Sequence, residues 1–313
     1  MIRLGLIGCG EHSRGGHAVP LARYQAEHAG EIELAAACDM HLERAENFCK
    51  EFGFQKAYRD FNEMLSGESL NGCIAVVPPE RISELGVALL QREIPCVVEK
   101  PLAASLAELK KLVDAATSTQ TPNMVSMNRR FMPFLNRALA SVHDTPRYLR
   151  CTLARHARLE PQFLWETAVH AVDTLRYIAG DVRSFDAVKL SGAAKGAWHG
   201  INLHFESGIE GRIDVLPTAG MVEEIYDIFG EGFRASVTCP FGQQRGWKTF
   251  QNGALVAEET LSAAMPEDVV NGFYDETSAF IRALKIGMPP RPSIADAAPS
   301  VELCFAIANR VGN

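Results

Sequence analysis

Two groups of side chains have the types and spacing that acid–base chemistry requires. In the first, Glu99-Lys100-Pro101 follows an apolar run that ends at Val98. A lysine at the carboxyl end of a buried strand lies where open α/β folds bind their ligands. Partial burial lowers the pKa of a lysine towards the range in which it exchanges protons. The alternative interpretation is an ordinary surface lysine after a strand.

The second group is Glu166, His170 and Asp173, followed by Tyr177. At 100° per residue these four side chains fall within a strip about 60° wide on a helix over residues 165–179. The rest of that segment is largely apolar, so the strip must face solvent or a polar cleft. Histidine exchanges protons near neutral pH, and the strip therefore predicts a functional site. No further ligands support a metal site at Glu-x-x-x-His, so no metal is expected.

A glycine-rich turn, Gly8-Cys9-Gly10-Glu11-His12-Ser13, follows the first apolar run. Between a strand and a helix, such glycines let the backbone approach a dinucleotide pyrophosphate at the helix N-terminus. Ser13 stands where a third glycine would allow the closest packing of helix on strand. A purely structural turn is the alternative interpretation.

Asp39 ends the second apolar run, where an acidic residue accepts the ribose hydroxyls of a bound dinucleotide. Its carboxylate would repel a 2′-phosphate, which favours NAD over NADP. The alternative role is a cap for the helix after Met40. Arg44 keeps NADP open, because a nearby cation accommodates the extra phosphate.

In the first 120 residues, apolar runs alternate with helical patterns. This alternation predicts the strands and helices that position the glycine turn, Asp39 and Lys100. The expected strands are 2–7, 32–38, 72–77, 94–98 and 124–127, and the expected helices are 16–28, 41–52, 80–91 and 105–117. Continuous apolar strands separated by helices indicate a parallel sheet that is covered on both faces.

Strand and turn signals dominate the rest of the chain. Helices are expected at 134–141, 165–179, 269–286 and after Ser293, a strand at 147–156, and hairpins at 201–215, 225–237 and 249–256. Asn252-Gly253 is a strong hairpin dipeptide. The predicted fold class is α/β: a doubly wound Rossmann domain over 1–122, with a boundary near Pro122, and an α+β domain over 123–313 with a large, predominantly antiparallel open sheet. The prediction leaves open whether the last helix packs back on the first domain.

Composition narrows the function classes. The chain has 313 residues, of which 47% are hydrophobic and 22% charged, and its formal net charge is −7. This balance argues against nucleic-acid binding, which needs a clustered basic surface. No apolar run is long enough to span a membrane. The eight cysteines show no C-x-x-C spacing and the N-terminus shows no signal-peptide pattern, so a cytoplasmic location is expected.

Taken together, these residues resemble the Gfo/Idh/MocA family, which includes glucose–fructose oxidoreductase and inositol dehydrogenases. The resemblance runs over most of the chain. It rests on Gly-Leu-Ile-Gly-Cys-Gly at 5–10, Cys38-Asp39 with Glu43-Arg44-Ala45, Val77-Pro78-Pro79, Glu99-Lys100-Pro101, Asn128-Arg129-Arg130-Phe131 and Ser293-Ile294-Ala295-Asp296-Ala297.

Four positions depart from the family pattern. Glu166 replaces the first aspartate of Asp-x-x-x-His-x-x-Asp, which moves the carboxylate by roughly a bond length. Ser13 replaces a small glycine or alanine, and the glycine turn is one residue longer before His17. Ile82 stands where many members carry histidine.

The resemblance implies an NAD(P)-dependent oxidoreductase that interconverts a hydroxyl and a carbonyl on a sugar, cyclitol or related polyol. Lys100 would polarise the reacting oxygen, His170 would exchange its proton, and Glu166 would orient His170 or bind a substrate hydroxyl. Substrate contacts are expected from Lys100, Asn128, Glu166, His170 and Asp173, with a structural role for Asp173 as an equal alternative. Cofactor contacts are expected from Gly8, Gly10, Glu11, His12, Ser13, Asp39, Arg44, Pro78, Pro79, Glu99, Lys100 and Asn128.

Other functions of the same fold remain open. The chain is alternatively a dinucleotide-binding sensor or interaction protein without turnover, a reductase of a non-sugar substrate, or an enzyme of NAD-assisted glycosidic cleavage. The resemblance also implies a homodimer or homotetramer formed through the open face of the C-terminal sheet. Tyr226, Ile228, Arg234 and Ser236 are candidates for that face.

Overall fold

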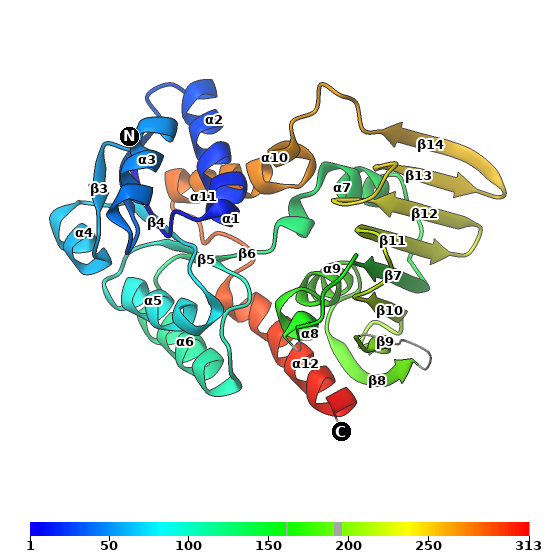
Figure 1. Ribbon diagram of the computed structural model, residues 1–313. Helices are drawn as coiled ribbons and strands as arrows, with labels where there is room; N and C mark the ends of the chain where they lie inside the picture. The colour runs from blue at the N-terminus through cyan, green and yellow to red at the C-terminus, as the bar shows by residue number, and fades with distance from the viewer. Residues whose placement is uncertain (161, 191–195, 313) are drawn as a thin grey trace. The chain divides into compact units, whose positions relative to one another are not determined.

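The chain folds into two compact units, shown in the ribbon diagram of a computed structural model (Figure 1). The structure describes residues 1–160, 162–190 and 196–312. Unit 1 combines Met1–Met127 with Phe273–Pro299, and unit 2 combines Asn128–Gly272 with the chain from Ser300 onward. The ranges expected from the sequence, 1–122 and 123–313, are contiguous, whereas each unit takes two separate parts of the chain.

Unit 1 is built on a six-stranded parallel sheet in the order β3-β2-β1-β4-β5-β6. The strands are β1 (Ile2–Ile7), β2 (Ile32–Cys38), β3 (Lys56–Tyr58), β4 (Gly72–Ala75), β5 (Cys96–Glu99) and β6 (Asn123–Ser126). Every residue of β2, β4 and β5 is buried, as expected for strands covered on both faces. The strand order is that of a Rossmann sheet, so the predicted fold of this part is confirmed.

Two pairs of helices lie on opposite sides of this sheet (Figure 1). One pair is α2 with α11, and the other is α5 with α6. The helices of unit 1 are α1 (Glu11–Ser13), the π-helix η1 (Arg14–Ala18), α2 (Val19–Glu27), α3 (Leu42–Phe52), α4 (Phe61–Gly67), α5 (Pro79–Gln91), α6 (Leu106–Thr119) and α11 (Phe273–Ile286). Ser105 caps α6 by accepting a hydrogen bond from the Glu108 amide.

Helix α11 is the part of unit 1 that the sequence pattern does not assign to it. Its Phe280 and Leu284 lie beside Gly72 of β4, where a Cβ would come within 3.2 Å of both side chains. Lys285 pairs with Glu31 at 2.7 Å, ahead of β2. The final helix, α12 (Ile294–Gly312), begins in unit 1 and ends in unit 2.

Unit 2 is built on an eight-stranded sheet in the order β14-β13-β12-β11-β7-β10-β9-β8. Its strands are β7 (Tyr148–Ala154), β8 (Val182–Leu190), β9 (Trp198–Phe205), β10 (Glu210–Leu216), β11 (Glu223–Gly230), β12 (Phe233–Thr238), β13 (Gly246–Gln251) and β14 (Ala254–Thr260). Among the described residues of unit 2, only β7 and β10 pair in parallel, so the predicted, mainly antiparallel sheet is confirmed. Asn252 and Gly253 both have positive φ, which the turn between β13 and β14 requires.

Helices cover one face of this sheet. Helix α7 packs on β12 and β13, and α9 packs on β7 and β10. The helices of unit 2 are the 3₁₀ helix η2 (Asn128–Phe131), α7 (Pro133–Ala140), α8 (Phe163–Glu166), α9 (Val169–Ala179) and α10 (Glu267–Val270).

The register of the sheet changes which residues can lie on its open face. Tyr226 and Ile228 are each only 1% exposed, because alternate residues of β11 point to the covered face. Arg234 and Ser236 alternate with buried residues of β12 and line a cavity of about 490 Å³ on the other face. The first two candidates were wrong, because a shift of one residue exchanges the two faces of a strand.

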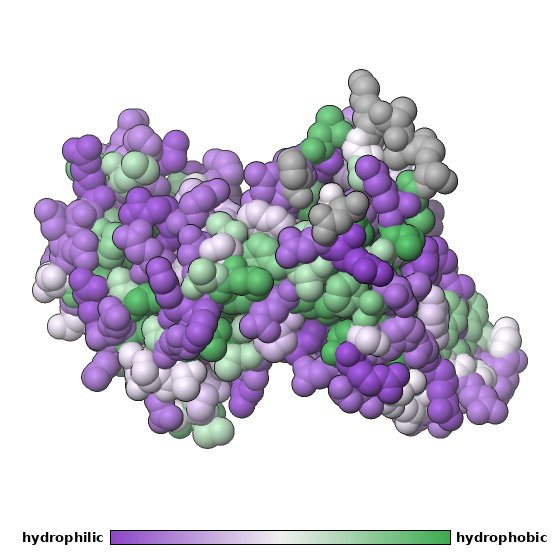
Figure 2. Space-filling model, turned by 90° about the horizontal axis from the view of Figure 1, so that it is seen from below, coloured by the Kyte–Doolittle hydropathy of each residue, from purple (hydrophilic) through white to green (hydrophobic). Residues whose placement is uncertain are grey.

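Hydrophilic and hydrophobic residues are interspersed on the face of the molecule shown in Figure 2. Among the described residues, none of the helices combines the length and the apolar character that a membrane span needs.

Candidate active site

The glycine turn at the end of β1 has the backbone geometry of a dinucleotide site. Gly8 has a φ of +93°, and a Cβ there would come within 1.8 Å of the Val76 carbonyl oxygen, so only glycine fits. A Cβ on Gly10 would have no heavy atom within 4 Å. The backbone at Gly10 is therefore open to a ligand at the start of α1.

The extra residue of this turn is absorbed by a π-helical turn, η1, between α1 and α2. Insertions of this kind are frequent at functional sites. The side chain of Ser13 is buried, and its hydroxyl has no hydrogen-bond partner among the described residues. His17, at the end of η1, is also buried. The lengthened turn thus turns a histidine inward.

Asp39 follows β2, and its carboxylate fastens two loops of unit 1. One oxygen accepts a hydrogen bond from the Cys9 amide and the other from the His41 amide, both at 2.9 Å. His41, and not Asp39, is the N-cap of α3, so these contacts do not support the capping alternative. Arg44 is exposed on α3. Recognition of the ribose by Asp39 stays a prediction.

A cavity of about 300 Å³ opens at the glycine turn. It lies within unit 1, at the carboxyl ends of the strands, where open α/β sheets bind ligands. Its lining residues are Gly10, Glu11, His12, Ser13, Val76, Val77, Pro78, Glu99 and Lys100. Seven of the predicted cofactor residues are in this set, whereas Gly8, Asp39, Arg44, Pro79 and Asn128 are not.

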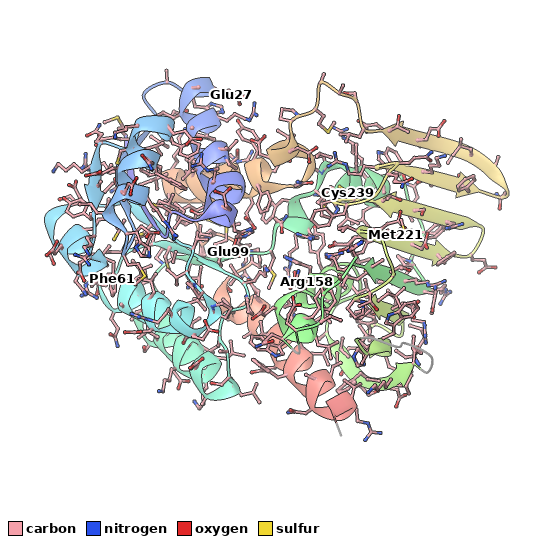
Figure 3. The ribbon with its side chains drawn as sticks, viewed as in Figure 1. Glu27, Phe61, Glu99, Arg158, Met221 and Cys239 are labelled. Carbon is pink, nitrogen blue, oxygen red and sulfur yellow. The ribbon has the colours of Figure 1, made fainter. Side chains whose placement is uncertain are left out.

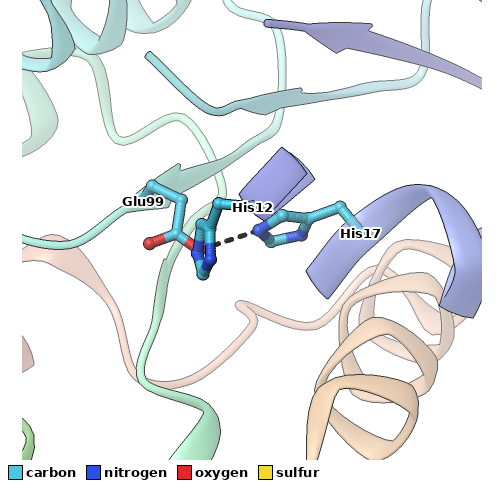
Figure 4. Close-up of side chains that lie close together, drawn as sticks. All are labelled: His12, His17 and Glu99. Atoms are coloured by element: carbon cyan, nitrogen blue, oxygen red, sulfur yellow. Dashed lines mark hydrogen bonds and ion pairs between the residues drawn. The ribbon is translucent and has the colours of Figure 1, made fainter. Parts of the chain in front are cut away.

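Glu99 is the buried centre of this region (Figures 3 and 4). Its Oε1 lies 2.9 Å from Nε2 of His12 and 2.8 Å from Nε2 of His17. Burial by itself raises the pKa of Glu99, but the two histidines outweigh it and hold the pKa well below its usual value. The carboxylate therefore stays ionised inside the fold.

Lys100 is half-buried at the rim of the cavity. Its backbone amide donates a 2.9 Å hydrogen bond to Oε2 of Glu99. The carboxylate thus holds the histidines with one oxygen and the backbone of Lys100 with the other. This arrangement fixes the start of the lysine side chain beside the glycine turn.

The second group of predicted catalytic residues lies on two helices instead of one. Glu166 ends α8, whereas His170 and Asp173 are on α9. Thr167 and Ala168 separate the two helices, so the single strip expected from a continuous helix is wrong for Glu166. His170 is 6% exposed, and its carbonyl oxygen accepts a hydrogen bond from the Thr174 hydroxyl.

Asp173 is fully engaged inside unit 2. Its two carboxylate oxygens accept hydrogen bonds from Nε and Nη2 of Arg130, both at 2.7 Å. The Ser300 hydroxyl donates a third, at 2.8 Å. Arg130 also lies over the Tyr177 ring, 5.4 Å from its centre. These contacts support the structural alternative for Asp173, and its substrate role stays a prediction.

Asn128 is buried at the start of unit 2. Its amide nitrogen donates to the Asn271 carbonyl at 2.8 Å, and its amide oxygen accepts from Arg129 at 3.0 Å. Both ends of this side chain therefore hold unit 2 together. Its predicted place beside the nicotinamide is not supported by these contacts and stays a prediction.

A buried charge cluster in unit 2 was missed by the sequence reasoning. Glu224, which is fully buried, accepts hydrogen bonds from Arg129, Arg155 and Tyr226. Burial raises the pKa of Glu224, but the two guanidinium groups outweigh it and lower the pKa to about 2. Both arginines also lie over the Phe241 ring. In the sequence, the only indication of this cluster was the presence of polar residues within β11.

The comparisons with known proteins bear on unit 1 first. Residues 2–127 match the sequence model of an oxidoreductase family with an NAD-binding Rossmann fold, Gfo/Idh/MocA. This match confirms, for these residues, the resemblance predicted from the sequence. The NAD-binding Rossmann fold given for the family agrees with the strand order and the glycine turn.

Relatives of known activity cover more of the chain. A D-apiose dehydrogenase from Paraburkholderia graminis is 28% identical over 239 residues, which are 71% of this chain and 62% of that protein. The match thus spans less than two thirds of that relative. A myo-inositol 2-dehydrogenase from Thermotoga maritima is 22% identical over 335 residues, covering 97% of this chain and 95% of the relative.

Solved structures confirm the fold over the whole chain. A dehydrogenase from Chromobacterium violaceum superposes with a TM-score of 0.88 at 17% identity and covers 100% of this chain and 96% of its own. An oxidoreductase from Agrobacterium radiobacter, solved in complex with NAD⁺, L-tartaric acid and magnesium, has a TM-score of 0.82 at 20% identity, with 100% and 96% of the two chains covered.

Proposed function

We propose that the protein catalyses hydride transfer between the nicotinamide of NAD and a hydroxyl or carbonyl carbon of a sugar, cyclitol or related polyol. The observation that carries the proposal is the half-buried Lys100, whose backbone is fixed by Glu99 at the rim of the glycine-turn cavity. The family match and the names of the apiose and inositol dehydrogenases support the reaction class and the substrate class.

The cavity residues suit a dinucleotide. The open space at Gly10 and the glycine requirement at Gly8 fit the close approach of a pyrophosphate. Bound NAD supplies the hydride acceptor or donor, while this chain supplies orientation and proton transfer. Asp39 favours NAD, because a carboxylate repels the 2′-phosphate of NADP.

In this proposal, Lys100 donates a hydrogen bond to the reacting oxygen and stabilises the charge that develops on it. His170 accepts the hydroxyl proton during oxidation and returns it during reduction. Glu166 orients His170 or binds a neighbouring substrate hydroxyl. The contacts of Asp173 and Asn128 support a structural role for both in unit 2, and their contacts with substrate and cofactor stay predictions.

Replacement of the lysine tests the proposal. Lys100→Met should lower kcat by about 10²–10⁴-fold, the usual contribution of a positioned acid–base group. NADH absorbance with a panel of sugars and cyclitols, including D-apiose and myo-inositol, measures the rate with both NAD and NADP. The matched control is Lys110→Met on the exposed side of α6, which should keep the full rate.

An unchanged rate in Lys100→Met would contradict the assignment of the lysine. Urea denaturation should give a free energy of unfolding like that of the unaltered chain and show that the variant is folded. If the unaltered protein binds NAD but turns over no member of the panel, the chain is instead a dinucleotide sensor. Transient reduction of bound NAD without net turnover would indicate glycosidic cleavage.

We also propose a cytoplasmic homodimer or homotetramer that forms through the open face of the unit 2 sheet. All eight cysteines are free thiols, which suits a reducing compartment. Arg234 and Ser236 line the cavity on that face. Light scattering measures the mass of the particle in solution, and a monomer at micromolar concentration would refute the assembly.

A further inference from the structure

Three ionisable side chains converge beside the glycine-turn cavity of unit 1. His12 comes from α1, His17 from η1 and Glu99 from the end of β5 (Figure 4). The two Nε2 atoms and one carboxylate oxygen lie within 4.8 Å of one another. The sequence does not predict this group, because 82 residues separate His17 from Glu99.

The donor set is one that transition metals use. Two imidazole nitrogens and one carboxylate oxygen supply three protein ligands and leave a fourth position open, as in catalytic zinc sites. Imidazole suits zinc, cobalt and nickel, whereas magnesium and calcium prefer oxygen ligands. The chemistry of the three side chains therefore selects a divalent transition metal.

The geometry needs only a small adjustment to hold such an ion. Bonds of about 2.0–2.1 Å in a tetrahedral site place ligand atoms about 3.3 Å apart. Nε2 of His12 and Nε2 of His17 lie 2.9 Å and 2.8 Å from Oε1 of Glu99, so each separation must widen by roughly half an ångström. The side chain of His12 is 54% exposed and can shift by this amount without disturbing the core.

Neighbouring groups hold the ligand side chains in place. Oε2 of Glu99 accepts the Lys100 amide, which orients the carboxylate, and this kind of outer contact stabilises metal sites. The rings of His12 and His17 pack against Phe273 at 6.1 Å and 6.4 Å between centres. His12 and Glu99 also line the cavity, so a water or a small ligand can enter at the fourth position.

We infer that His12, His17 and Glu99 form a binding site for one divalent transition-metal ion, of the zinc and cobalt class, at the edge of the glycine-turn cavity. The site lies wholly within unit 1. It does not depend on the proposed reaction, because binding of the ion is measured without substrate or NAD.

Co²⁺ is the probe, because its visible absorption depends on the number and arrangement of its ligands. The full chain, freed of metal with a chelator, is titrated with Co²⁺ in the absence of NAD. We expect one Co²⁺ per chain, with the strong visible absorption of a four-coordinate ion. Zn²⁺ should abolish this absorption at one equivalent, whereas Mg²⁺ in large excess should leave it unchanged.

Removal of one ligand makes the test specific. His12→Ala should weaken Co²⁺ binding by at least about 100-fold, because loss of a direct ligand costs no less than loss of an outer contact. His143→Ala, at an exposed loop position in unit 2, is the matched control and should bind Co²⁺ like the unaltered chain. Because His12 is exposed, its variant should fold.

Two results would overturn the inference. One is the absence of stoichiometric Co²⁺ binding by the unaltered chain. The other is equal binding by His12→Ala and His143→Ala, which would place the ion elsewhere. In either case the three side chains form a hydrogen-bonded group only, and the Lys100→Met test of the proposed reaction stands unaffected.

Discussion

In each unit, a buried glutamate is held by two nitrogen-bearing side chains. In unit 1, Glu99 lies between His12 and His17, and in unit 2, Glu224 lies between Arg129 and Arg155. In both units, the partners hold the pKa of the carboxyl below its usual value against the effect of burial. The arrangement is alike, but the partners differ in chemistry.

The difference lies in what the partners can do. Arginine stays protonated in proteins, so the cluster around Glu224 has a fixed charge, and all three side chains are buried. Histidine gains and loses a proton near neutral pH and binds metals as the neutral ring. His12 and Glu99 also line a cavity. The cluster around Glu224 therefore stabilises the fold, while the cluster around Glu99 is suited to a ligand.

The largest expected effect is on the fixed cluster. Glu224→Gln should reduce the free energy of unfolding by about 3–5 kcal/mol, because it leaves two buried guanidinium groups without a compensating charge. Urea denaturation at pH 7 measures the loss. Glu258→Gln is the control: it removes an exposed ion pair with Lys248 and should change the free energy of unfolding by less than about 1 kcal/mol.

The effect of Glu224→Gln on the free energy of unfolding should also depend on pH, and the sign of that dependence follows from the pKa. The pKa of Glu224 is about 2 in the folded chain and 4.5 for the free group, so its ionised form stabilises the fold above pH 4.5. That stabilisation, about 3 kcal/mol, is lost as the pH falls towards 2. The difference in stability between the unaltered chain and Glu224→Gln should shrink over this interval. A constant difference would contradict the fixed-charge interpretation.

The sequence predicts the two clusters unequally. The glycine turn, the strand ends and Lys100 follow from local patterns, so Glu99 was predicted at the sheet edge where the structure has a cavity. Glu224 was not, because its partner Arg129 lies 95 residues away and only the fold brings them together. Glu224 is polar but lies on the buried face of β11. It therefore hid the alternation of polar and apolar residues that would have placed Tyr226 and Ile228 on that face.

Two other features of the fold were not predicted from the sequence, for a related reason. The interruption between α8 and α9, and the packing of α11 on unit 1, depend on contacts between distant segments and not on local periodicity. The extra residue before His17 was visible in the sequence, but its consequence was not. A π-helical turn accommodates it and turns His17 towards Glu99.

The smallest expected effects separate the two histidines of the Glu99 cluster. His17 is 3% exposed at its side chain and His12 is 54% exposed, although both contact the same carboxylate oxygen. His17→Ala should cost about 1–3 kcal/mol of unfolding free energy, because it opens a cavity and removes a buried partner of Glu99. His12→Ala should cost less than about 1 kcal/mol, since its ring is largely in solvent. Urea denaturation of the metal-free chain measures both, and equal losses would mean that the exposed histidine is as structural as the buried one.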